Sequence, residues 1–279
     1  MRLHRLRSFH EFELHAIRDD DTYKAELAAL EALVPKTGKS FTIPGYSCTA
    51  QAHVNFRVIV SEEPKRYVNW RETVDCPITG FNNRMRSTIQ LLDTEAGLYP
   101  SSRIYLTEQL TPMYAYLRKR FPLTIGSEFL GDGQTPGWVN PRGIRHEDLT
   151  QLSFEPESFD AVVSLDVMEH IPNFPDAFRE TARVLVPGGK MIWSAPFVDL
   201  LPQNHIMARI VDGEIEYLTE PEYHGDPVTN EGVLCYTRFG WEVLQQAKQN
   251  GFRDAYALTF HAPEYGYVGA RQYLFVCVK

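Results

Sequence analysis

Three side chains that could do chemistry, Asp166, Glu169 and His170, directly follow a run of apolar residues at 159–165. Carboxylates accept hydrogen bonds from hydroxyl and amino groups, and the imidazole ring of histidine exchanges a proton near neutral pH. The apolar run has the length and composition of a buried β-strand. Because open α/β sheets bind ligands at the carboxyl ends of their strands, we expect these side chains at a ligand-binding edge.

The elements around this run alternate between strand and helix patterns. An amphipathic helix pattern follows residues 159–171, and then come Pro-Gly-Gly at 187–189 and a second apolar run. Strand, helix, turn and strand in this order predict two neighbouring strands of a parallel sheet. Strands are also expected at 103–106 and 123–131, with a helix at 112–120 between them. The predicted fold class is therefore α/β, with a doubly wound sheet.

The same two segments resemble class I S-adenosylmethionine (SAM)-dependent methyltransferases of the type 11-like group. That family commonly carries FDxVxxxxVxEHxx and RVLxPGGxxxxxxP; this chain reads FDAVVSLDVMEHI at 159–171 and RVLVPGG at 183–189, and its second pattern ends in Pro196. The resemblance covers residues 103–279. It implies SAM as the cofactor and a Rossmann-like, mostly parallel sheet that ends in an antiparallel pair, here expected at 252–259 and 272–278.

The turn after the first strand of the large sheet departs from the family pattern. The family has a glycine-rich turn there, because only glycine lets the backbone approach the methionine moiety so closely. Residues 103–121 of this chain contain no glycine. Thr111 and Pro112 instead favour a helix start, whose amides attract a carboxylate. Glu108 takes the place of the family's acidic residue that faces the amino group of SAM; the alternative is an ordinary turn residue.

The other cofactor contacts implied by the resemblance lie at later strand ends. Glu128 is placed to accept two hydrogen bonds from the ribose hydroxyls. Asp148 and the amide of Leu149 are expected to contact the adenine ring. Ser164 and Asp166 are expected to lie beside the methyl group. A single glutamate after a strand is usually just solvated, so the role of Glu128 depends on its place in this series.

Residues 197–240 form an insertion where class I methyltransferases commonly build acceptor specificity. Methyl transfer is an in-line displacement, so alignment in a dry pocket supplies much of the catalysis, and a base matters only when the acceptor must lose a proton. His224, in a predicted turn at 224–227, is the first candidate base and His205 the second. For His170 we favour a structural hydrogen bond to a neighbouring loop.

A second resemblance covers residues 40–87. The sequence WRETVDCPITGFNNRMRS at 70–87 is similar to WRExxxCPxCGxNNRxR, found before the methyltransferase domain in some bacterial members, where two Cys-x-x-Cys pairs suit a zinc ribbon. Here Thr79 replaces one cysteine, and Ser47 and Ala50 align with the earlier pair. One or two thiolates do not close a structural zinc site. We therefore expect no bound metal and a module that folds on packing alone.

These patterns predict three regions: an N-terminal helical segment at 1–39, a small β-rich module with its following helix at 40–92, and a methyltransferase domain at 93–279. Within the first, a helix is expected at 22–34, and within the second a helix at 83–92. The last helix of the chain is expected at 241–249.

Composition narrows the possible partners and compartments. The net charge of −8 over 279 residues argues against a nucleic acid as main partner. No apolar run reaches the ~20 residues of a membrane span, and the N-terminus lacks the apolar block of a secretory signal. The four cysteines have no paired spacing and are expected to be reduced. We therefore expect a cytoplasmic protein without membrane association; its oligomeric state is left open.

Together these features predict a SAM-dependent methyltransferase that acts on oxygen or nitrogen of a small-molecule or glycan acceptor. The alternative is a non-catalytic protein of the same fold that binds a nucleoside ligand or a protein partner, because the loop glycines are missing. A nicotinamide-dependent enzyme is a third possibility. It fits less well, since it needs Gly-x-Gly-x-x-Gly for the pyrophosphate.

Overall fold

The computed structural model describes residues 1–62, 65–225 and 232–279, without the side chains of 18–20. The chain forms two compact units. The first comprises Met1–Leu6, His10–Gly97 and Leu258–Leu274, and the second comprises Arg7–Phe9, Leu98–Ala257 and Phe275–Lys279. The last two strands of the chain therefore contribute residues to both units. No helix among the described residues has the length and hydropathy of a membrane span.

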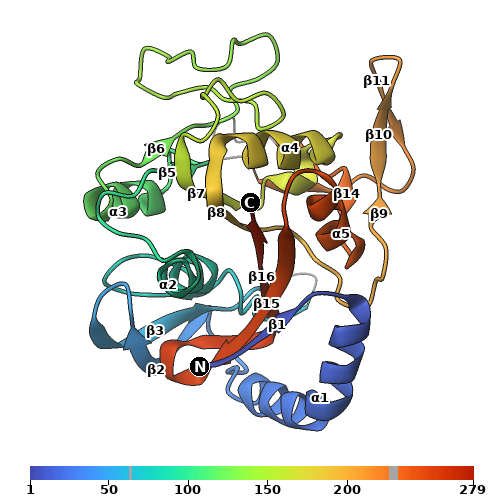
Figure 1. Ribbon diagram of the computed structural model, residues 1–279. Coiled ribbons are helices and arrows are strands. Elements are labelled where there is room, and N and C mark those ends of the chain that lie inside the picture. Colours follow the sequence, from blue (N-terminus) through green and yellow to red (C-terminus); the bar gives the residue numbers. More distant parts are fainter. Residues whose placement is uncertain (63–64, 226–231) are drawn as a thin grey trace. The chain divides into compact units, whose positions relative to one another are not determined.

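A seven-stranded sheet has the order β1-β15-β16-β8-β7-β5-β6 (Figure 1). In that order the strands are Arg2–Leu6, Asp254–Ala262, Tyr267–Val278, Leu185–Ser194, Phe159–Leu165, Ile104–Leu106 and Ile125–Gly126. Strands β6, β5, β7 and β8 are parallel, and β16 is antiparallel to β8. A parallel bridge between Glu128 and His146 extends the sheet beyond β6. This topology confirms the predicted α/β fold with an antiparallel final strand.

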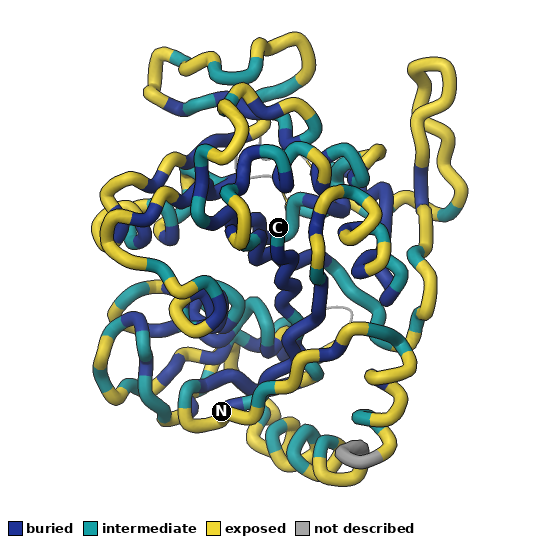
Figure 2. The backbone as a smooth tube through the Cα atoms, viewed as in Figure 1, coloured by how far each residue is buried: buried dark blue, intermediate teal, exposed yellow. Residues whose placement is uncertain are grey.

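The central strands form because their side chains are apolar on both faces. Val162 and Val163 of β7 and Ile192 of β8 are fully buried, as expected for parallel strands covered on both sides. Helix α4 (Phe174–Val184) packs on β8 and buries one face that includes Phe178. Each large apolar side chain buried in this way contributes about 1.5–3 kcal/mol. Figure 2 shows the buried backbone of these strands in dark blue.

Strand β8 begins earlier than the sequence pattern indicates. The pattern predicts a Pro-Gly-Gly turn at 187–189, whereas β8 runs from Leu185 through these residues. Its register with β7 shifts between Phe159 and Ala161, so the glycines form an irregularity inside the strand. Gly188 has φ +82°, which favours glycine, and a Cβ atom on Gly189 would lie 2.9 Å from the carbonyl oxygen of Val186.

The predicted β-rich module is a three-stranded antiparallel sheet followed by a helix in the first unit. Its elements are β2 (Ser40–Ser47), β3 (Ala52–Ile59), β4 (Val74–Asp75) and α2 (Asn83–Ala96). Asn82 caps α2 by accepting a hydrogen bond from the amide of Met85 at 2.9 Å. The N-terminal helix α1 spans Phe9–Glu31 and contains most of the predicted 22–34 segment. Strand β1 before it was not predicted.

Arg86 gives the NNRMR segment at 82–86 a structural role. Its guanidinium is fully buried and donates to the carbonyl oxygens of Val74 at 2.6 Å and Phe81 at 3.0 Å. It also lies over the ring of Phe56, with 4.1 Å to the ring centroid. Burial lowers the pKa of Arg86 to about 10. The segment thus ties α2 to the small sheet.

The positions aligned with zinc-ribbon cysteines carry a hydroxyl network. The Ser47 and Thr49 hydroxyls are 3.2 Å apart, and those of Thr49 and Thr79 are 3.4 Å apart. Burial raises the pKa of Cys76 and hydrogen bonds with Ser47 and Thr79 lower it; the net direction is downward. Side-chain hydrogen bonds through Thr49 therefore connect two of the positions that align with those cysteines, Ser47 and Thr79.

The described residues of the insertion after Pro196 form three two-stranded antiparallel pairs before the last helix. The pairs are β10 (Ala208–Val211) with β11 (Glu214–Tyr217), β12 (Tyr223–Gly225) with β13 (Gly232–Leu234), and β14 (Thr237–Arg238) with β9 (His205–Ile206). The β10–β11 hairpin is mostly exposed (Figure 2). Helix α5 covers Glu242–Gln249, close to its predicted bounds. Of the predicted turn at 224–227, residues 226–227 lie outside the described residues.

Candidate functional site

The glycine-free loop after β5 is held by side chains that come from later strand ends. Oε1 of Glu128 accepts hydrogen bonds from the backbone amides of Gln109 and Leu110, both at 2.7 Å. The Gln109 side chain donates to the carbonyl oxygen of Gly143 at 2.8 Å and accepts from the amide of Arg145 at 2.9 Å. These bonds fix the loop without the conformational freedom of glycine.

The N-terminus of α3 (Pro112–Arg120) lies at the end of this loop. Thr111 is its N-cap residue, and the Thr111 hydroxyl is buried without a hydrogen-bond partner among the described residues. Tyr114 packs so closely against β6 that a Cβ atom on Gly126 would lie 2.7 Å from its ring. Pro112 has no amide hydrogen, and the amide of Tyr114 donates to the Thr111 carbonyl oxygen at 3.2 Å. The buried Thr111 hydroxyl is therefore the group at this helix start that could meet a polar group of a ligand.

Asp148 builds a tight turn at the outer end of the strand edge. Its Oδ1 accepts from the amide of Thr150 at 2.8 Å and from the Thr150 hydroxyl at 2.7 Å. Leu149, the other adenine candidate, is buried. Glu147, which the sequence analysis did not single out, is buried next to them and accepts from Arg145 at 2.7 Å. Glu147 and Arg145 therefore form a structural ion pair within this segment.

Ser164 and Asp166 occupy different environments at the end of β7. Ser164 is fully buried, and its oxygen accepts a hydrogen bond from the Thr107 hydroxyl at 3.2 Å, so it connects β7 to the end of β5. Asp166 is half-buried and has φ +53°, which is uncommon outside glycine. Its Oδ1 accepts from the Ser194 hydroxyl at 2.7 Å, and its amide donates to the Ser194 carbonyl at 2.8 Å.

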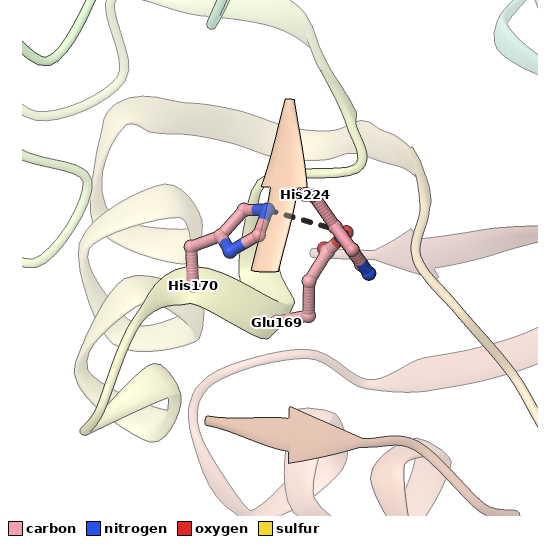
Figure 3. A group of neighbouring side chains, drawn as sticks. All are labelled: Glu169, His170 and His224. Atoms are coloured by element: carbon pink, nitrogen blue, oxygen red, sulfur yellow. Dashed lines mark ion pairs between the residues drawn. The ribbon is translucent and has the colours of Figure 1, made fainter. Parts of the chain in front are cut away.

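Glu169, His170 and His224 gather just beyond the end of β7 (Figure 3). Glu169 and His170 come from the short helix η1 (Met168–His170), and His224 comes from β12 of the insertion. Oε1 of Glu169 lies 3.5 Å from Nδ1 of His224 and 3.7 Å from Nε2 of His170. The Glu169 side chain is fully buried, whereas the two histidines are partly exposed.

The second nitrogen of each histidine is also held. Nδ1 of His170 donates to the carbonyl oxygen of Leu234 at 2.8 Å, so its hydrogen bond is to strand β13 of the insertion, where a loop was expected. Nε2 of His224 lies 3.2 Å from Oε1 of Glu222. The Glu169 carboxylate raises the pKa of His224, burial opposes this, and Glu222 adds to the increase. Burial raises the pKa of Glu222, but His224 and Arg238 lower it more.

The structure thus brings together some predicted site residues and not others. Glu128 contacts the loop that carries Glu108, and His224 meets the Glu169 and His170 pair. His205 lies in β9, exposed and paired with β14. Sequence reasoning did not combine Glu169 with His224, and it missed Glu222. One available signal was the spacing of Glu222 and His224, because alternate residues of a strand share a face.

Part of the chain is similar to a family of known proteins. A family model described as a methyltransferase domain matches residues 125–193, which contain β6, β7 and all of β8 except its last residue. This segment carries a methyltransferase signature. The match includes Glu128, Asp148, Ser164, Asp166 and Glu169.

Curated relatives are similar over a limited part of their length. A phthiotriol/phenolphthiotriol dimycocerosates methyltransferase of Mycobacterium leprae is 32% identical over 96 residues, 33% of this chain and 33% of that protein. Its namesake in Mycobacterium tuberculosis is 39% identical over 61 residues, 22% of this chain and 21% of the relative. The chain therefore spans about a third or less of these relatives. A SAM-bound amino pentose methyltransferase from Micromonospora echinaspora has 16% identity and a TM-score of 0.42, with 69% of this chain and 89% of that chain covered.

Proposed function

We propose that this protein is a SAM-dependent methyltransferase that acts on a small-molecule or glycan acceptor at oxygen or nitrogen. The observation that carries the proposal is the match of residues 125–193 to a methyltransferase domain, because these residues form the strands whose carboxyl ends carry the candidate ligand side chains. The strand order, with its antiparallel final strand, supports it independently.

The donor and acceptor groups at the strand ends fit the parts of SAM. The buried Thr111 hydroxyl, at the start of α3, suits the carboxylate of the methionine moiety. Glu108 is proposed for the amino group, Glu128 for the ribose hydroxyls, and Asp148 with the Leu149 amide for adenine. SAM supplies an electrophilic methyl group on a sulfonium centre.

The chain's own contribution to the reaction is proposed to be alignment of the acceptor and exclusion of water. Asp166 lies at the end of β7, and two hydrogen bonds to Ser194 fix it there. It is proposed to line the pocket beside the methyl group that is transferred, with its carboxylate already oriented. For an acceptor that must lose a proton, His224 is the first candidate base and His205 the second. The contacts of His224 with the buried Glu169 favour the first.

Binding calorimetry with S-adenosylhomocysteine tests the cofactor assignment, and formation of that product from SAM across a panel of hydroxyl and amine acceptors tests the reaction. We expect saturable binding with one ligand per chain and turnover with at least one acceptor class. A folded protein that binds no S-adenosylhomocysteine would contradict the proposal.

One observation favours the alternative of a non-catalytic binding protein. The loop after β5 contains no glycine, and Glu128 already accepts two amides of that loop. A loop held in this way, by a carboxylate that already accepts two hydrogen bonds, suits a pocket for a ligand other than SAM. S-adenosylhomocysteine binding without turnover in any acceptor class would support this second function.

A further inference from the structure

We propose that Glu169, His170 and His224 form a binding site for one divalent first-row transition metal ion (Figure 3). The three side chains offer one carboxylate oxygen and two imidazole nitrogens, a ligand set that suits Zn²⁺ and related ions. This inference goes beyond the proposed methyl transfer. It concerns a different class of ligand, and its first test does not involve SAM.

When the two rings are neutral, their hydrogen bonds fix which nitrogens carry lone pairs. The carbonyl oxygen of Leu234 only accepts, so Nδ1 of His170 carries the hydrogen and Nε2 of the neutral ring points its lone pair toward Glu169. The carboxylate of Glu222 likewise accepts from Nε2 of His224. Nδ1 of His224 then presents its lone pair to the same Glu169 oxygen.

Three electron-pair donors therefore converge on one small volume. The separations of 3.5 Å and 3.7 Å are longer than ordinary N–H···O hydrogen bonds. Neither carboxylate oxygen of Glu169 has a hydrogen-bond partner among the described residues, although the side chain is fully buried. A buried carboxylate in this state needs a compensating positive charge. A cation between the three donors supplies it.

The spacing is close to that of ligands around a shared ion. Bonds of about 2.0–2.2 Å in tetrahedral or octahedral geometry place neighbouring ligand atoms about 3–3.5 Å apart. All three ligand atoms here lie within 4.8 Å of one another. Small side-chain rotations therefore close the site, without movement of η1 or β12.

The surroundings of the cluster also match a metal centre. Metal-binding histidines usually donate their other nitrogen to a carbonyl or carboxylate, which orients the ring. Leu234 and Glu222 provide one such acceptor each. Glu222 is itself held by Arg238 at 2.9 Å. Because the side chains of His170 and His224 are 16% and 27% exposed, water or a substrate oxygen can reach a remaining coordination position.

The test uses the untagged full-length protein after treatment with a chelator. Titration with Zn²⁺, followed by metal analysis of the washed protein, should give one tightly bound ion per chain, and Co²⁺ should give an absorption spectrum typical of nitrogen and oxygen ligands. Glu169→Gln, His170→Ala and His224→Ala should each weaken Zn²⁺ binding by at least tenfold. Glu222→Ala should weaken it by about 10–100-fold through loss of the outer contact.

A matched control comes from a second histidine pair. The rings of His4 and His15 are 4.2 Å apart in the first unit, so His15→Ala removes a competing surface site and should leave tight Zn²⁺ binding unchanged. Glu169→Gln removes the buried charge and should melt no lower than the metal-free parent. Its loss of binding then cannot result from misfolding.

Equal Zn²⁺ binding by the parent and by the triple variant E169Q/H170A/H224A would overturn the proposal, as would the absence of binding to a folded parent. Absence of binding would leave the contacts of Glu169 with His224 and His170 as the compensation for its buried charge. S-adenosylhomocysteine binding is measured separately, so failure of the metal site leaves the proposed function intact. Failure of the cofactor assay likewise leaves the metal proposal standing.

Discussion

Oε1 of Glu128 accepts a hydrogen bond from the backbone amide of Gln109 at 2.7 Å, which links the end of one strand to the loop that follows its neighbour. The amide of Leu110 donates to the same oxygen. In this protein a carboxylate fixes a loop that is glycine-rich in the methyltransferases the sequence resembles. The same carboxylate is the proposed ribose contact. Loop geometry and cofactor affinity should therefore change together.

Replacement of Glu128 by alanine should raise the Kd for S-adenosylhomocysteine by about tenfold or more, since a charged hydrogen bond contributes about 1.5–3 kcal/mol. Glu128→Gln keeps an acceptor and should have a smaller effect. Calorimetry measures both, with Glu214→Ala on the exposed β11 strand as control. Unchanged affinity in Glu128→Ala would remove the ribose assignment.

Asp166 should respond differently to alanine and to asparagine. Alanine loses the bond from Ser194 and tolerates φ +53° less well than aspartate, whose side chain can hydrogen-bond locally, so Asp166→Ala should lower the free energy of unfolding by about 1–2 kcal/mol. Asparagine tolerates this backbone conformation and keeps an acceptor oxygen. Urea denaturation should therefore show a smaller loss for Asp166→Asn; equal losses would argue against the Ser194 contact.

The Glu180 and Arg183 pair should make stability depend on pH in the acid range. The hydrogen bond from Arg183 lowers the pKa of Glu180 in the folded state, against burial, and the amide of Leu152 adds to the decrease. A lowered carboxyl pKa stabilises the protein above the unfolded pKa, and this stabilisation is lost as the pH falls through the folded pKa. Because the pair is partly exposed, we expect about 0.5–1 kcal/mol.

Glu180→Gln should therefore reduce the free energy of unfolding at neutral pH and flatten its dependence between neutral and acidic pH. Denaturation curves at several pH values measure this difference. A parent and variant that differ by a constant amount at every pH would contradict the assignment.

Arg86→Met should be strongly destabilising, by about 3–5 kcal/mol, because the buried carbonyl oxygens of Val74 and Phe81 lose their donor. Arg2→Met, at a side chain that is 46% exposed, is the control and should change little. Thermal unfolding of the purified variants measures both. A small effect of Arg86→Met would mean that packing of α2 alone holds the module.

In the metal-free protein, His224→Ala should lower turnover far more than affinity for S-adenosylhomocysteine if His224 accepts a proton from the acceptor. A bound ion would occupy the Nδ1 lone pair that a base needs. His170→Ala separates this role from metal binding, because it removes one proposed ligand and leaves the His224 ring in place. Steady-state kinetics on an accepted substrate measure kcat and KM for each. Equal losses of turnover and cofactor affinity in His224→Ala would remove its assignment as base.

Local sequence patterns predicted the helices and strands whose side chains are buried in a regular pattern along the element. Residues 159–165 are mostly apolar and all but Asp160 are buried, so the strand was predictable, as was the amphipathic α5. Strand β1 was not predicted, because RLHRL has no clear alternation and its pairing depends on the last strands of the chain. The Pro-Gly-Gly segment favours a turn locally, but pairing with β7 keeps it within β8.

In the candidate site, the positions of single residues were predictable, whereas contacts between distant segments were not. The position of Glu128 after an apolar strand was visible in the sequence, but its hydrogen bonds to Gln109 and Leu110 depend on the spacing of two strands. The meeting of Glu169 with His224 depends on how the insertion folds over η1, where the amide of Tyr236 donates to the carbonyl oxygen of Glu169. No local pattern encodes that contact.

The most direct test of the account is a crystal structure of the protein with S-adenosylhomocysteine at saturating concentration. We predict that the ligand lies across the carboxyl ends of β5, β6 and β7, with its ribose at Glu128 and its adenine at Asp148. An empty strand edge in a well-ordered crystal, or a ligand bound elsewhere with Glu128 still bonded only to the loop amides, would contradict the central claim.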